Sequence, residues 1–144
     1  MRRLNFAATP ERNTHALHKE KLAAASEEDT TRTILFGNGW PNAPHRALRT
    51  RFVETWMPRE SEVRAFASEP QIGETVIAGL SMPVPRFAAL PPNNATKGDI
   101  ESMALLAGQS VGLVNDVKPA GEIVRDMMVE AKRIVATLGS PAWV

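Results

Sequence analysis

The stretch "AGQSVGLV", residues 107–114, interrupts apolar sequence that otherwise predicts helix. Inside a helix, glycine costs about 1 kcal/mol relative to alanine. Two glycines four residues apart therefore indicate a turn or a close approach of the backbone to a neighbour. Gln109 and Ser110 place an amide and a hydroxyl at that point. From composition alone, the pattern favours a helix-to-helix turn with close packing over a binding site, and neither GxGxxG nor GxxxxGK occurs.

The sequence on both sides of this stretch predicts helices. Asp99 is a suitable cap for a helix over 100–108, "IESMALLAG". Downstream, Pro119 opens a helix over 119–138, which Gly139 and Pro141 end. The apolar residues of this second helix keep a helical period, which predicts one buried face. They are Ile123, Met127, Ala131, Ile134, Val135 and Leu138.

The N-terminal third contains signals for two more helices and one strand. Thr9 is a suitable N-cap and Pro10 a suitable first residue for a helix over 10–25. The β-branched "TTRTILF" predicts a strand over 30–36, followed by the loop "GNGWPNAP". Pro44 opens a helix predicted over 44–57. An apolar stripe recurs at every fourth position of that helix: Leu48, Phe52 and Trp56.

The middle of the chain, residues 58–97, is rich in loops and contains six prolines. Because proline interrupts helices, no long helix is expected beyond residue 70. Two short strands are predicted around 74–80, "ETVIAGL", and 83–89, "PVPRFAA". The sequence "LPPNNATKGD" predicts a connecting loop.

Composition is ordinary for a soluble domain and excludes several classes of site. The 144 residues are 43% hydrophobic and 23% charged, and the net charge is +1. So small a net charge gives no reason to expect a nucleic acid or an anionic membrane as partner. Without cysteine, neither a disulfide framework nor a thiolate metal site can form. No apolar run has the length of a signal peptide or a membrane span, and a cytoplasmic location is expected.

The histidines offer only weak signals for chemistry. His15 and His18 share one side of the predicted first helix, where a pair could hold a metal. The sequence offers no third ligand at a recognisable spacing, so a solvated helix face is the favoured interpretation. His45 follows Pro44 at a predicted helix start, a position that favours a neutral imidazole. An ordinary first-turn polar residue is the simpler reading there.

Two clusters of charge have similar alternatives. The acidic "SEEDT", residues 26–30, could bind a cation, although a solvated loop is the default. A basic cluster could bind a phosphate, with Arg46 and Arg49 on one face of the predicted helix, but surface solubility is the better explanation. Its members are Arg32, Arg46, Arg49 and Arg51.

Taken together, four stretches resemble the C-terminal part of the nitronate monooxygenase family, also called the 2-nitropropane dioxygenase family. They are "FAATPE" (6–11), "AAASEEDTTRT" (23–33), "GNGWPNAPHRALRTRFVETW" (37–56) and "GDIESMALLAGQSVGLVNDVKPAGEIVRDMMVEAKRI" (98–134). The specific parts are "WPNAPHRALR" and "MALLAGQSVGLV". The resemblance implies an α/β fold: the C-terminal part of an FMN-binding TIM barrel with its helix-rich α+β second domain. The chain by itself is expected to be mainly helical, with a few short strands.

The resemblance also implies a division of the chain and the absence of parts of the site. Residues 1–8 would end the last barrel strand, 9–97 would form the smaller substrate-side domain, and 98–144 would contain a return segment and the closing barrel helix. The family's "GTRF", which helps to hold the flavin phosphate, is here "RLNF" at 3–6. None of the three histidines occupies the place of the family's catalytic histidine, so no catalytic residue is assigned.

The function implied by the resemblance is that of an FMN-dependent oxidoreductase of the nitronate monooxygenase type, present as a C-terminal fragment. The alternative is a non-catalytic remnant or interaction module that pairs with a separate barrel chain. In the complete fold, Gly108, Gln109 and Ser110 would line the FMN, with an alkyl nitronate or related small molecule as substrate. The chain alone is expected to bind no FMN. The helices over 44–57 and 119–138 would partly cover a barrel, so self-association is expected.

Overall fold

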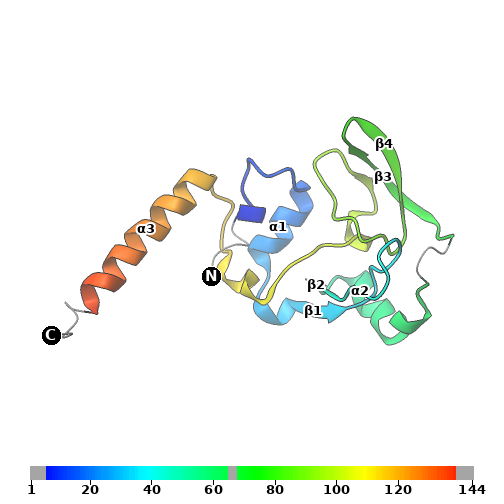
Figure 1. Cartoon of the computed structure of the whole chain (residues 1–144), viewed down its shortest axis with the longest axis horizontal. Coiled ribbons are helices and arrows are strands. Elements are labelled where there is room, and N and C mark those ends of the chain that lie inside the picture. The colour runs from blue at the N-terminus through cyan, green and yellow to red at the C-terminus, as the bar shows by residue number, and fades with distance from the viewer. Residues whose placement is uncertain (1–5, 65–67, 139–144) are drawn as a thin grey trace.

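A computed structural model describes residues 6–64 and 68–138. The fold is α/β, and the described residues form three α-helices and two small sheets. The chain forms a body, residues 6–117, from which the last helix extends as a separate arm (Figure 1). The elements are α1 (Ala16–Ala24), β1 (Thr30–Thr33), β2 (His45–Leu48), α2 (Arg51–Trp56), β3 (Gln71–Ile77), β4 (Leu80–Pro85), β5 (Lys97–Gly98) and α3 (Ala120–Thr137).

Both sheets are antiparallel, and in the second sheet glycines permit a tight turn and a close approach of two strands. β1 pairs with β2, and the second sheet has the order β4-β3-β5. Ala78 and Gly79 join β3 to β4 with φ values of 51° and 81°, as a two-residue hairpin with positive φ at both positions requires. Where β3 meets β5, a side chain on Gly73 would collide with the Lys97 carbonyl, so only glycine permits this approach.

The segment 103–107, "MALLA", is the centre of the body. It pairs with β2 around one bridge, Ala47 to Leu106: Leu48 N donates to Leu105 O at 2.9 Å, and Ala107 N donates to Arg46 O at 3.0 Å. Its side chains alternate between two core clusters. Met103, Leu105 and Ala107 enter the first with Leu22, Leu48, Val84, Ile100 and Val111, and Ala104 and Leu106 enter the second with Leu35, Phe36, Ala47, Val53 and Phe87.

The helix predicted over 100–108 is therefore wrong. Only 100–102 form a short 3-10 turn, and the chain beyond it is a non-helical segment that makes one isolated β-bridge and packs on both faces. A run of five apolar residues suits a doubly buried strand as well as a buried helix, and periodicity cannot separate the two. Pairing with β2 decides the outcome.

The helix predicted over 44–57 is also wrong in its first half. Residues 45–48 form β2, and the helix begins only at Arg51, where Thr50 caps it by accepting a hydrogen bond from Val53 N at 3.3 Å. The predicted stripe is divided as a result. Leu48 belongs to the first cluster, whereas Phe52 and Trp56 pack against the second, so the face of α2 is not left free.

The first helix, predicted over 10–25, begins six residues later than expected. Its N-cap is His15, whose Nδ1 accepts from Leu17 N at 3.2 Å, and not Thr9. Upstream residues instead contact the 92–94 loop: His15 N donates to Pro92 O, and Asn94 N donates to the Asn13 side chain. Contacts distant in sequence outweigh the local cap signal here.

The short strands are confirmed as elements, with shifted ends. The strand predicted over 30–36 is β1, which ends at Thr33. The pair predicted around 74–80 and 83–89 is the β3–β4 hairpin, at 71–77 and 80–85. Residues 3–6, where the sequence comparison finds "RLNF", lie outside the described part except for Phe6, as do Gly139 and Pro141.

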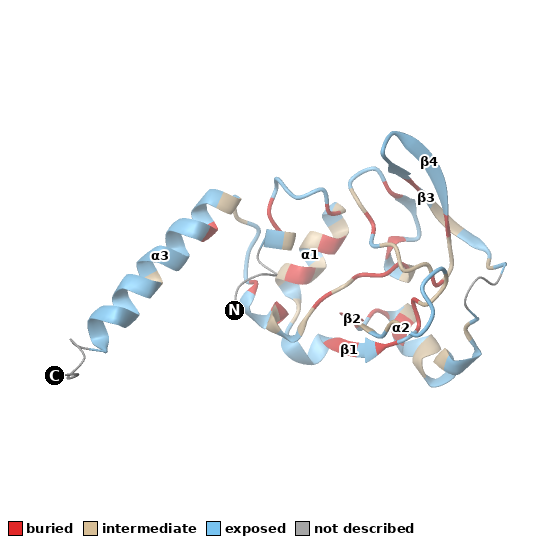
Figure 2. Cartoon of the chain, in the orientation of Figure 1, coloured by how far each residue is buried: buried red, intermediate tan, exposed pale blue. Residues whose placement is uncertain are grey.

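The last helix is confirmed at 120–137, but its predicted burial is not. Of its apolar face only Ile123 is buried, and Figure 2 shows most of the rest of α3 exposed. The reason is that α3 leaves the body after its first turn, as Figure 1 shows. No helix among the described residues is long and apolar enough to cross a membrane.

Candidate functional site

The turn 108–113 follows directly from the central segment. Gly108 is extended (φ −87°, ψ 170°), and Gln109–Leu113 form a 3-10 turn in which Val111 N donates to Gly108 O at 3.0 Å. Buried Val111 and Val114 fix the turn to the body. Since a non-helical segment precedes it, the expected helix-to-helix turn is wrong. Gly108 needs no left-handed backbone there.

The second glycine is not required by close packing. A Cβ atom on Gly112 would lie 3.4 Å from Glu27 N and 3.8 Å from Ser26 Cα, which is ordinary van der Waals contact. The turn thus lies against the short 3-10 helix Glu27–Asp29. The turn packs against a neighbour as expected, but the structure leaves room for a Cβ atom at Gly112.

These two turns border an open depression of about 490 Å³. Gln109 is exposed and Ser110 is half-buried at its rim. Neither side chain makes a hydrogen bond to another residue in the described ranges, so both are available to a ligand. The lining residues are Ser26, Glu27, Glu28, Gln109, Ser110, Gly112 and Leu113.

The electrostatics of the depression favour an uncharged polar ligand group. Its charged lining residues are Glu27 and Glu28. Asp29 beside them is committed elsewhere: it accepts from Ser26 N and Ser26 Oγ, each at 2.8 Å, and these bonds lower its pKa. A phosphate would meet two carboxylates and no cation in this lining, whereas an amide-like edge could bond to Gln109 and Ser110.

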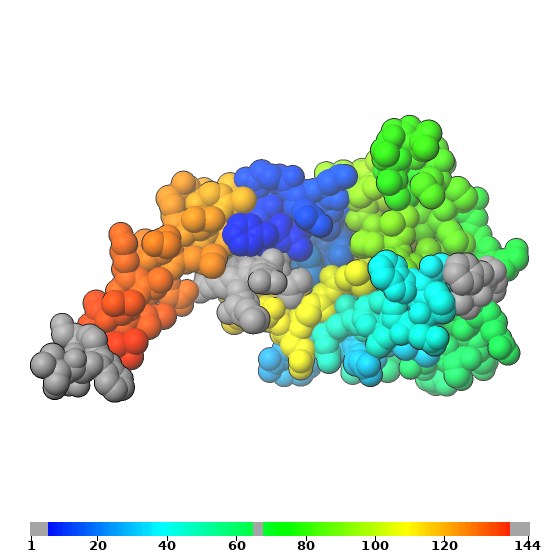
Figure 3. Space-filling view, in the orientation of Figure 1, coloured from blue at the N-terminus to red at the C-terminus, as the bar shows by residue number. Residues whose placement is uncertain are grey.

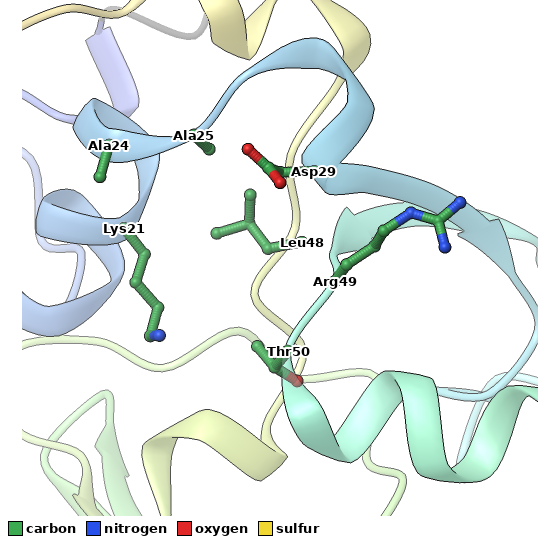
Figure 4. Close-up of a pocket in the computed structure, with 7 residues that line it drawn as sticks. All are labelled: Lys21, Ala24, Ala25, Asp29, Leu48, Arg49 and Thr50. Carbon is green, nitrogen blue, oxygen red and sulfur yellow. The ribbon is translucent and has the colours of Figure 1, made fainter.

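A second, smaller depression of about 200 Å³ lies between α1 and the start of α2 (Figure 4). Its two basic groups are already engaged. Lys21 forms an ion pair with Glu101, and Arg49, whose guanidinium points away from Lys21 in the figure, donates to Glu28 O at 3.1 Å. Neither basic group of this depression is therefore free to bind an anion.

The histidines lie in different surroundings from those expected. His18 is 4% exposed, so a solvated face is wrong for it; its Nε2 donates to Leu106 O at 3.2 Å, and its Nδ1 has no partner among the described residues. Burial is the main cause that lowers its pKa to about 4. His45 lies on β2 and not at a helix start, with Nε2 donating to Phe36 O at 2.9 Å.

The acidic and basic clusters make contacts within the protein. Within the described ranges no group of acidic or histidine side chains could hold a metal. The "SEEDT" segment is a capped 3-10 turn rather than a plain loop. Arg46 donates to Thr30 Oγ1 at 3.1 Å from strand β2, so Arg46 and Arg49 do not share a helix face.

Sequence reasoning missed two features around the turn. The acidic wall of the depression had a usable signal, because Ser26 and Asp29 have the spacing of a capping box that fixes the 3-10 turn. The hydrogen bond from His18 to Leu106 had no signal in the sequence, because 88 residues separate the two partners.

Two solved structures that are similar to this chain are of FabK, a TIM-barrel flavoenzyme, and they resemble it over part of their length. FabK from Thermotoga maritima is 27% identical with a TM-score of 0.59, and the match covers 92% of this chain and 36% of FabK. A mutant of the same FabK gives 27% identity and a TM-score of 0.53, covering 92% and 33%. No protein-family model and no curated protein matches the chain.

FabK is an FMN-dependent oxidoreductase of the 2-nitropropane dioxygenase-like superfamily. The resemblance found in the sequence is therefore confirmed at the level of that superfamily, and the nitronate monooxygenase type remains a prediction. The chain spans about a third of the length of the FabK chains that it matches. The division at residues 8 and 97 also stays a prediction.

Proposed function

We propose that this chain is part of an FMN-dependent oxidoreductase of the nitronate monooxygenase type, in which Gly108, Gln109 and Ser110 line the flavin. One observation carries the proposal: an exposed amide and a half-buried hydroxyl, neither bonded to another described residue, stand at the rim of a depression in a chain similar to a flavoenzyme. The FMN supplies the redox chemistry when bound, and the protein binds and orients it.

The residues present fit one end of FMN. The edge of the flavin ring presents N–H and C=O groups, which an amide and a hydroxyl can satisfy. Glu27 and Glu28 do not suit the phosphate, which needs cations or backbone N–H groups from elsewhere. An open depression also cannot bury most of a cofactor, as binding sites do. This chain thus contributes one wall, and we expect the purified chain to show no stoichiometric flavin absorption.

The two candidate classes of reaction differ in their substrates. The sequence resemblance favours oxidation of an alkyl nitronate, whereas some relatives in that family reduce enoyl thioesters or quinones. A direct assay uses the chain joined to the FabK barrel in place of the segment that it matches. Oxygen uptake with a nitronate supports the proposal, and nicotinamide oxidation with an enoyl thioester alone contradicts the nitronate type.

Substitutions at the turn test the flavin contact. Valine adopts the extended backbone of Gly108 without strain, so Gly108→Val tests whether added bulk next to Gln109 hinders the flavin. Gln109→Ala removes the amide. In the joined protein each change should weaken FMN binding by about tenfold, the effect of losing one such contact. Gln71→Ala, on the distant strand β3, is the control. If both turn variants bind FMN like the parent, the turn is only a packing device.

The alternative is a non-catalytic module that pairs with a barrel chain, and the exposed face of α3 favours it. A joined protein that folds cooperatively yet takes up no FMN would select this alternative.

A further inference from the structure

The peptide group between Leu106 and Ala107 is held at both of its polar ends, directly before Gly108. Its carbonyl, Leu106 O, accepts from His18 Nε2 on α1 at 3.2 Å. Its amide, Ala107 N, donates to Arg46 O on β2 at 3.0 Å. Because a peptide group is planar, these two bonds fix its orientation. Gly108 has no side chain of its own to anchor, so the turn that follows takes its direction from this peptide group.

α1 supplies a second anchor for the same turn. His18 and Leu22 are four residues apart on α1 and therefore share one side of the helix. Leu22 is completely buried in the first cluster, which also contains Val111 from the turn, and α1 contacts the turn directly. The α3 arm stands clear of the body in Figure 3, which leaves the turn to be held by the body.

His18 is buried with only one of its ring nitrogens bonded. Since Leu106 O can only accept, Nε2 carries the ring proton, and Nδ1 is left as a lone pair with no partner among the described residues. A second proton would place a positive charge in a side chain that is 4% exposed. The central segment 103–107 and the turn contain no ionisable side chain that could compensate for it.

The charge that acts on His18 among the described residues is that of His15, on the same helix, and it opposes a second proton as burial does. Both effects lower the pKa of His18, to about 4, whereas an exposed histidine has a pKa near 6.5. His18 therefore takes up a proton more readily after it has left its site. Leaving the site breaks the bond to Leu106 O and parts α1 from the central segment.

We infer that His18 is a positioning residue of the candidate site: its bond to Leu106 O sets the turn that carries Gln109 and Ser110, and proton uptake by His18 releases this turn. The inference rests on the proposed function for the identity of the ligand and adds its regulation by pH. Release becomes easier as the pH falls from about 6.5 towards 4, because the open form then binds a proton that the closed form does not.

Amide hydrogen exchange of the full chain tests the release directly. The amides of Ala107 and Val111 report on the turn, since they donate to Arg46 O and Gly108 O. Several low urea concentrations separate local opening, which exposes little surface, from global unfolding. After correction for intrinsic rates, local opening at these two amides should be about tenfold or more easier at pH 5 than at pH 7.5. Local opening of the β3–β4 hairpin should not change with pH.

Three variants separate the bond from the proton. His18→Gln keeps a donor and cannot titrate, so the turn should stay closed at both pH values. His18→Leu leaves Leu106 O unpaired, so the turn should open about tenfold more readily at both pH values. His45→Leu is the matched control, because it also removes a bond from a histidine to a backbone carbonyl, Nε2 to Phe36 O at 2.9 Å. It should leave the turn as in the parent.

The parent and His18→Gln decide the question even if His18→Leu fails to fold. The inference is overturned if the turn amides exchange only through global unfolding, if their local opening in the parent does not depend on pH, or if His18→Gln keeps the pH dependence of the parent. The last result would assign the proton to another group, such as His15.

FMN affinity of the chain joined to the FabK barrel is read separately. In the parent it should weaken over the same pH range, and His18→Gln should remove that dependence. If the turn opens as expected while FMN affinity does not follow, the flavin contact of the proposed function is contradicted and the positioning role of His18 stands.

Discussion

The body and the α3 arm differ in where their stability originates. The body closes around two clusters in which Leu22, Leu35 and Phe36 are completely buried. The arm is twice as long as α1, with 18 residues against 9, yet buries only Ile123. A strong helical pattern therefore shows which face needs a partner, and it does not show that the partner lies within the same chain.

The largest expected effect comes from truncating a core side chain of the body, compared with a similar truncation on α3. Leu105→Ala should destabilise the body by about 2–5 kcal/mol, because the side chain is 1% exposed and leaves a cavity. Val124→Ala on α3, where the side chain is 50% exposed, should leave the unfolding midpoint nearly unchanged. Urea unfolding followed by tryptophan fluorescence measures both. Similar losses for the two variants would mean that the arm packs on the body in solution.

Acid should weaken the body through His18. Because the folded-state pKa is about 4, below the ordinary value of 6.5, the unfolded state binds a proton first. The stabilisation is complete above pH 6.5 and is lost as the pH falls towards 4, by about 3 kcal/mol at most. His18→Gln keeps a donor for Leu106 O and should flatten the pH dependence in this window. An unchanged slope in that variant contradicts the prediction.

The smallest effect concerns the base of the arm. The pKa of Glu11 is lowered, first by a bond from its own backbone N–H and then by the Ala120 N–H. Glu11→Gln removes the charge from the start of α3, so amide exchange at 120–123 should accelerate without a change in the body. Glu20→Gln on α1 is the control. If the amides at 120–123 stay protected in Glu11→Gln, the contacts of Ile123 and Lys118 are sufficient to hold the start of α3.

The contrast between the body and the α3 arm also explains which elements could be predicted from the sequence. The bounds of α3 follow from Pro119 and the helical period, which are local signals. The strand at 45–48 and the non-helical segment at 103–107 do not, because "HRAL" and "MALLA" are good helix formers. "HRAL" extends by pairing with β1, and one bridge joins it to "MALLA". Thr50 was a readable cap that would have corrected the first error.

The candidate site was predictable only in part. Gly108–Ser110 stood out because glycines and polar groups interrupt apolar sequence. Gln109 and Ser110 border a depression, whereas Gly108 does not line it, and the flavin contact stays a prediction. The facing carboxylates of Glu27 and Glu28 come from 80 residues away, where local patterns carry no information about proximity. The family resemblance supplied the flavin, and no pattern in the residues alone indicates it.

The alternation of 103–107 between two clusters restricts how this chain can change in length. Substituting one side chain there alters one cluster, but adding or removing a single residue moves every following side chain to the opposite cluster. Leu105 and Leu106 would then exchange environments, and the bonds to β2 would shift register. Homologous chains should therefore vary in composition across this segment while keeping its residue count constant.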